Sequence, residues 1–162
     1  MKYPATLIAA LLFSFAHMAF SGAAQAGMDN VTAYSVEGDF ADVRQDLADA
    51  VINRGFVIDY EAMIGDMLER TAADVGAKTT VYKDAQAVQF CSATVSRTAM
   101  EADAANIAYC PYVLFVYERA DKPGTVTVGF RRMPDTGSDA TRQALAAVNA
   151  LLDEIVREAA GM

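Results

Sequence analysis

The sequence contains no tryptophan, and its only histidine, His17, lies near the N-terminus. If that N-terminal segment is cleaved as a signal peptide, the mature chain has no histidine at all. Catalysis by a serine–histidine or cysteine–histidine pair is then excluded. An ordinary tetrahedral zinc site is disfavoured as well, because only two sulfur ligands, Cys91 and Cys110, remain to hold the metal.

The first 26 residues are typical of a secretory signal peptide. Lys2 supplies a positive start, the segment 5–20 is almost continuously apolar, and Ala24-Gln25-Ala26 matches the small-x-small cleavage pattern. The apolar segment is shorter than the roughly 20 residues that a membrane-spanning helix needs. We therefore expect residues 1–26 to be cleaved, and residues 27–162 to form a single exported, periplasmic domain without a membrane span.

Basic residues are scarce. The full chain has 13 Lys and Arg residues against 21 Asp and Glu residues, a net charge of −8, and cleavage would also remove Lys2. Nucleic acids and anionic lipids are bound through basic patches, and the sequence contains no basic run. Nucleic-acid binding is therefore excluded as a function.

Alternating and helical hydrophobic patterns predict an α+β domain. A turn signal at residues 121–124 predicts a hairpin, and hence a largely antiparallel sheet with helices on one face. Asp39 and Asp59 are the expected N-caps of the first two helices. The expected strands are 30–38, 56–59, 79–82, 85–90, 112–117 and 125–131. The expected helices are 40–54, 60–75, 92–102 and a last one that starts at Ser138 or Asp139 and ends at Ala160.

The expected strand 112–117 is apolar on both of its faces. A strand of this kind is covered on both sides. Helices cover one face of the predicted sheet, so the other face needs a separate cover. A second subunit, a bound ligand or a loop would provide one, and a homodimer through the helix-free sheet face is among these solutions.

Cys91 and Cys110 are the residues best suited to chemistry. In an exported protein, an even cysteine count indicates a bridge. Closing a loop of about 20 residues would stabilise the fold by about 3 kcal/mol. The alternatives are a buried reduced pair, a soft-metal or haem site, and a redox-active thiol pair.

Four further residues are secondary candidates. Met67 and Met100 carry thioethers, which select copper(I) or haem iron, although methionine at helical spacing usually fills gaps in a core. Arg97 near a helix start would lower the pKa of Cys91 and make it a redox thiol. The structural alternative is that Ser92 caps this helix and that Arg97 is solvated.

Several motifs resemble the uncharacterised domain family three-hundred-and-two, over roughly residues 39–132. They are Met67-Leu68-Glu69-Arg70-Thr71 with Asp74-x-Gly76, Phe90-Cys91-Ser92-Ala93, Asn106-Ile107 and Cys110-Pro111-Tyr112. The resemblance implies a small domain with a curved antiparallel sheet gripping helices, similar to the TATA-box-binding (helix-grip) architecture. It also implies that dimers are reasonable, and it implies no established reaction.

Many cytosolic members of the family that this chain resembles carry a cysteine pair. The resemblance carries that pair over onto Cys91 and Cys110 alone. Because the cytosol disfavours disulfides, this shifts weight from a structural bridge toward a thiol, metal or haem site. The sequence thus predicts an exported binding or accessory domain and not an enzyme. Its site is the two-cysteine pair, whose ligand the sequence does not identify. The alternatives are a thiol–disulfide redox protein and an interaction domain with an inert disulfide.

Overall fold

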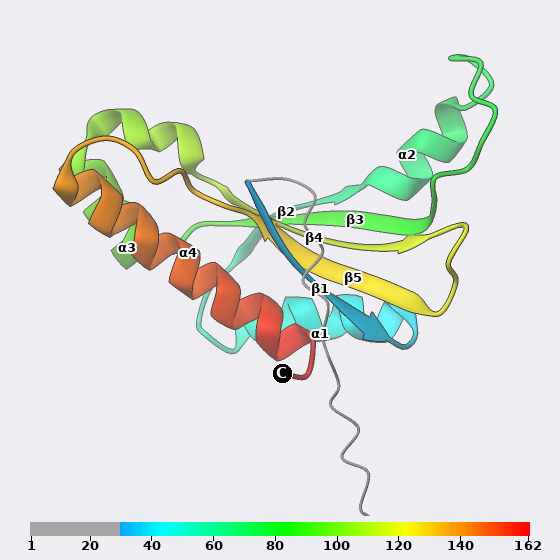
Figure 1. The fold of residues 1–162 in the computed structure, drawn as a ribbon, viewed down its shortest axis with the longest axis horizontal. Coiled ribbons are helices and arrows are strands. Elements are labelled where there is room, and N and C mark those ends of the chain that lie inside the picture. Colours follow the sequence, from blue (N-terminus) through cyan, green and yellow to red (C-terminus); the bar gives the residue numbers. More distant parts are fainter. Residues whose placement is uncertain (1–29) are drawn as a thin grey trace, which may run out of the picture.

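A computed structural model describes residues 30–162, which form an α+β domain (Figure 1). Its five-stranded antiparallel sheet is open and has the strand order β1-β5-β4-β3-β2. The strands are β1 (Val31–Glu37), β2 (Ile58–Met63), β3 (Tyr82–Phe90), β4 (Tyr112–Arg119) and β5 (Thr125–Arg131). The helices are α1 (Phe40–Ile52), α2 (Ile64–Thr71), α3 (Ala93–Ala102), the 3-10 helix η1 (Ala104–Tyr109) and α4 (Asp139–Ala159).

The predicted α+β class with an antiparallel sheet is confirmed. The predicted signal peptide, residues 1–26, lies outside the described residues. Within residues 30–162, no helix combines the length and the hydrophobicity that crossing a bilayer would require.

Local signals fix the helix ends. Asp39 accepts a hydrogen bond from the Ala41 backbone N–H at 2.8 Å and so caps α1 as predicted. Ser138 caps α4 in the same way, by accepting from the Thr141 backbone N–H at 3.2 Å. Gly55 follows α1 with φ +79°, the left-handed conformation that suits glycine after a helix.

The second predicted helix begins later than expected. Asp59 does not cap it, because this residue lies within β2, and α2 starts at Ile64 without a side-chain cap. The reason is pairing: Tyr60 and Ala62 lie opposite Gln89 and Ala87 of β3, and this extended pairing outweighs the local capping signal.

The hydrophobic core lies between one face of the sheet and the helices α1, α3 and α4 (Figure 1). Every second residue of the three central strands points into it, because successive side chains of a strand point to opposite faces of the sheet. Fully buried members from the strands are Val88, Phe90, Leu114, Val116, Val126 and Val128. Fully buried members from the helices include Leu47, Val51, Leu145, Val148, Leu152 and Ile155.

Helix α2 lies apart from the other three helices. It packs against β3 at the end of the opposite sheet face, and none of its residues is buried (Figure 1). Gly65 allows this close approach, because a Cβ there would lie 2.9 Å from the backbone nitrogen of Ala85. The otherwise helix-free face is therefore bounded by α2 at one side.

One carboxylate is buried at the β4–β5 hairpin. The Glu118 side chain accepts a hydrogen bond from the Gly124 backbone N–H at 2.7 Å and pairs with the Lys83 ammonium at 3.0 Å. These two interactions hold the pKa of Glu118 below its ordinary value of 4.5, and the backbone hydrogen bond has the larger effect. The carboxylate therefore fixes the turn that returns the chain to β5.

Glu118→Gln is expected to destabilise the domain by about 1–2 kcal/mol near neutral pH, because a charge-assisted pair and its hydrogen bonds are weakened. A lowered folded-state pKa contributes stability that is present above the unfolded pKa and is lost as the pH falls through the folded value. The difference in unfolding free energy between wild type and variant should therefore shrink as the pH falls from about 6 to about 3. Urea unfolding at a series of pH values measures it, and a constant difference would contradict the assignment.

Candidate functional site

Cys91 and Cys110 form a disulfide bond, with their Cα atoms 6.3 Å apart. Cys91 directly follows the last residue of β3, and Cys110 lies two residues before the first residue of β4. Because Phe90 pairs with Tyr112 across these neighbouring strands, the sheet register itself brings the two cysteines together. Of the states that the sequence left open, the structure contains the bridged pair.

A buried hydroxyl pair lies beside the bridge. The Ser96 hydroxyl is 3.0 Å from the phenol oxygen of Tyr112 and 3.8 Å from the sulfur of Cys110. Burial raises the pKa of the Tyr112 phenol. The pair satisfies a phenol inside the core and ties α3 to the start of β4, so its evident role is structural.

Ser92 makes the contact of a helix cap and Arg97 that of a solvated ion pair, as in the structural alternative to a redox site. The Ser92 side chain is buried and accepts a hydrogen bond from the Val95 backbone N–H at 3.4 Å, at the start of α3. Arg97 is exposed, and its guanidinium pairs with Glu101 one turn along the helix at 3.2 Å. Arg97 thus pairs with a solvent-exposed carboxylate and not with Cys91.

The two methionine candidates are not brought together. Met67 is exposed on α2, whereas Met100 is half-buried on α3, and these helices lie at opposite ends of the sheet (Figure 1). Within the part of the chain that the structure describes, no group of three or more His, Cys, Asp or Glu side chains is arranged to hold a metal ion.

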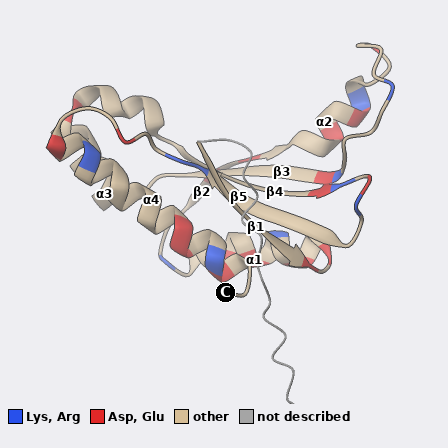
Figure 2. Cartoon of the chain, in the orientation of Figure 1, with Lys and Arg blue, Asp and Glu red and all other residues tan. Residues whose placement is uncertain are grey.

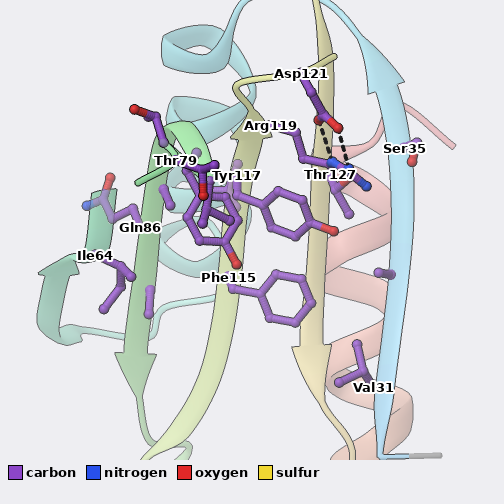
Figure 3. Close-up of a pocket in the computed structure, with 17 residues that line it drawn as sticks. Val31, Ser35, Ile64, Thr79, Gln86, Phe115, Tyr117, Arg119, Asp121 and Thr127 are labelled. Atoms are coloured by element: carbon purple, nitrogen blue, oxygen red, sulfur yellow. Dashed lines mark hydrogen bonds and ion pairs between the residues drawn. The ribbon is translucent and has the colours of Figure 1, made fainter. Parts of the chain in front are cut away.

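A groove of about 810 Å³ lies on the sheet face opposite α1 and α4 (Figure 3). Its lining comes from strands β1, β3, β4 and β5, the start of α2, the segment 79–81 and the turn between β4 and β5. We call this cavity the sheet groove. The sequence analysis assigned no site here. The feature that pointed to it was the strand 112–117, which is apolar on both faces and forms the floor of the groove.

Aromatic rings form the floor of the sheet groove. The ring centroids of Phe115 and Tyr117 are 6.0 Å apart, and those of Tyr117 and Tyr82 are 5.3 Å apart. The Phe115 ring lies over β5, where Gly129 leaves space for it: a Cβ at Gly129 would be 2.6 Å from the Phe115 Cζ atom (Figure 3). A continuous row of three rings results.

The side chains in the walls of the sheet groove are small, apolar or hydroxyl-bearing. Ile64 and Val81 stand on one side, and Ala33 and Ser35 of β1 stand on the other. The remaining hydroxyl groups on the walls and rim belong to Thr79, Thr80 and Thr127.

The charged residues among those lining the groove neutralise each other. The Arg119 guanidinium donates two hydrogen bonds to the Asp121 carboxylate, at 2.7 and 2.6 Å. This pair raises the pKa of Arg119 and lowers the pKa of Asp121. The Gln86 amide also borders the groove, but its polar atoms bond to Arg44 and Glu61. The surface offered to a ligand is therefore aromatic, hydroxylated and without unpaired charge.

Comparisons with known proteins agree with this fold. A crystal structure of an uncharacterized conserved DUF302 protein from Bacillus stearothermophilus matches with a TM-score of 0.67 and 12% identity, over 82% of this chain and 99% of that chain. At this identity the likeness concerns the fold alone. A comparison with curated proteins finds no match. The family model for the domain of unknown function DUF302 matches residues 32–159, and the chain therefore belongs to this family.

Proposed function

We propose that this chain is an exported, disulfide-stabilised binding domain whose ligand is a small neutral molecule held in the sheet groove. The groove volume of about 810 Å³ carries the proposal, because it lies within the range typical of small-molecule sites. Export is supported by the signal-peptide pattern of residues 1–26 and by the bridge between Cys91 and Cys110, since disulfides persist in oxidising compartments.

The lining indicates which ligands would fit. Rings such as Phe115 and Tyr117 favour flat or ring-shaped ligands, which gain from offset or edge-to-face contact. Hydroxyl groups on Ser35 and Thr127 can donate or accept single hydrogen bonds. A charged ligand would have to separate Arg119 from Asp121 to find a counter-charge, so a neutral one is favoured.

The cysteine pair has a different part in this proposal. In the β3–β4 register, the bridge adjoins the Phe90–Tyr112 pair, whereas the aromatic floor lies toward the Tyr82–Arg119 end. Both sulfur atoms are in the bridge, so binding of a soft metal or haem by the cysteines requires reduction first, and thiol exchange has to begin with attack of an external thiolate on the bridge. Those hypotheses stay predictions, and the bridge serves here as a staple at the other end of the strands.

Ala87→Leu tests the groove, because Ala87 lies on β3 opposite Phe115 and a larger side chain there would occupy ligand space. We expect wild type to bind a neutral naphthalene ketone dye saturably, with a rise in dye emission. The variant should bind it about tenfold more weakly or worse, the equivalent of 1.4 kcal/mol. Dye fluorescence titration measures both dissociation constants.

Val113→Leu is the matched control. Val113 lies on the same strand as Phe115 and on the same sheet face, two residues away, but it does not line the groove. Its affinity for the dye should equal that of wild type. Equal weakening in both variants, or dye binding that never saturates, would contradict the proposal.

A further inference from the structure

Strand β1 is an edge strand whose open side can be identified residue by residue. Its register with β5 is continuous, from Val31 opposite Arg131 to Glu37 opposite Thr125. Just beyond the two ends, the Arg132 N–H donates to the Asn30 carbonyl at 2.8 Å, and the Gly38 N–H donates to the Gly124 carbonyl at 3.1 Å.

Hydrogen-bonded and non-hydrogen-bonded pairs alternate along an antiparallel ladder. The two end bonds therefore place the even-numbered residues of β1 in hydrogen-bonded pairs with β5. The odd-numbered residues direct their backbone N–H and C=O groups away from β5, toward the open edge. These residues are Val31, Ala33, Ser35 and Glu37.

This edge lacks the protection that edge strands usually carry. Charged side chains, prolines and bulges normally prevent edge-to-edge pairing. The opposite edge strand, β2, has Asp59 and Glu61 and a register shift between Ile58 and Tyr60. Strand β1 contains no proline, no bulge and no charged residue before Glu37, and most of its length is tan, the colour of uncharged residues, in Figure 2. It is thus the edge that is suited to pairing.

The edge has a negative side chain at one end and a positive side chain at the other, so two copies in antiparallel orientation bring opposite charges together. Glu37 ends β1, and Arg131 of β5 lies opposite Val31 at the other end; both side chains are exposed. In an antiparallel pair of two β1 strands, with Ala33 opposite Ser35 of the second copy, Glu37 lies opposite Val31 of that copy. Arg131 of the second copy is then two strands away, about 10 Å, on the same sheet face, a distance that the two side chains span. A parallel pair would place Glu37 beside Glu37.

We propose that β1 pairs in antiparallel register with β1 of a second copy of this chain. The two five-stranded sheets join into one continuous sheet, with Glu37 of each copy facing Arg131 of the other. The wall of each sheet groove formed by Ala33 and Ser35 then lies at the centre of the dimer. This interface is the sheet edge, distinct from the sheet-face dimer that the sequence predicted, and it does not depend on any ligand.

Ala33→Pro tests the pairing directly. Its N–H faces the open edge, so proline removes a donor from the proposed interface while leaving the hydrogen bonds to β5 in place. Sedimentation equilibrium of protein expressed from the full chain should show a dimer for wild type and a monomer for this variant. Asp59→Pro, on the other edge strand, is the matched control and should remain dimeric. A monomeric wild type, or a dimeric Ala33→Pro protein, would overturn the proposal.

Charge reversal provides a second test that does not rely on proline. Glu37→Arg and Arg131→Glu should each weaken dimerisation about tenfold or more, because each dimer contains the contact between these two positions twice. The double variant should restore dimerisation, because opposite charges again face each other. Circular dichroism and melting confirm that each variant is folded. Failure of the double variant to recover the wild-type dissociation constant would overturn the proposed register.

Discussion

Replacing both Cys91 and Cys110 by serine should lower the free energy of unfolding by about 3 kcal/mol. The bridge closes a loop between residues separated by 19 positions, and the unfolded chain gains conformational entropy when that loop opens. The loss is expected to be close to the full value because the Phe90–Tyr112 pair already holds the two strands in the register that the bridge requires. For a domain of this size the melting temperature should fall by roughly 10 °C.

Urea unfolding of wild type and the double variant, with and without a thiol reductant, measures this effect. The reductant should bring wild type close to the double variant and leave the variant itself unchanged. Dye binding to the sheet groove should persist in the variant at low temperature, because the bridge does not line the groove. A loss of stability below about 1 kcal/mol would show that the bridge contributes little to the fold.

Gly129→Ala should destabilise the domain by about 2–3 kcal/mol, the upper part of the range for overpacking. A Cβ at this position would lie 2.4 Å from the backbone carbonyl oxygen of Thr32 and 2.6 Å from the Cζ atom of Phe115. The ring can rotate away, but the carbonyl belongs to the β1–β5 ladder and can move only if the two strands separate. The effect therefore comes mainly from backbone, and it should spread to the groove because Phe115 must move too.

Gly38→Ala is the matched control for this substitution. Its Cβ would meet only the Cγ2 atom of Val43 at 4.0 Å, an ordinary contact, so the change should stay within about 0.5 kcal/mol of wild type or stabilise slightly. Combining Gly129→Ala with Phe115→Ala separates the two contacts, because the second change removes the ring and leaves the carbonyl. Full recovery of stability in that double variant would contradict the backbone explanation.

Much of the fold follows from local patterns. Asp39 is a cap that the sequence predicts and the structure uses, and the alternation in β5 places Val126 and Val128 on the core side. The boundary between β2 and α2 could not be placed in the same way. Asp59 is a good cap in isolation, and only the pairing of β2 with β3, a contact between distant segments, makes it a strand residue.

The candidate site was harder to predict than the fold. The sequence showed that Phe115 and Tyr117 needed a cover, but it did not show that a cavity remains over them. That cavity exists because α2 stands at one side of the face and β1 at the other, which are relations between segments far apart in the chain. The cysteines were visible at once, yet their bridged state follows from the register of β3 and β4.

The central strands of the sheet are fastened at both ends, by the bridge next to Phe90 and Tyr112 and by the Lys83–Glu118 pair at the other. Strands held in this way do not fray, so amide hydrogens in β3 and β4 should exchange only through global unfolding. Helix α2 packs against β3 but has no buried residue, so it should open locally at a far lower free-energy cost than global unfolding. The sheet groove thus has a rigid aromatic floor and, at α2, one wall that moves more easily. The ligand proposed for the groove would enter and leave past α2.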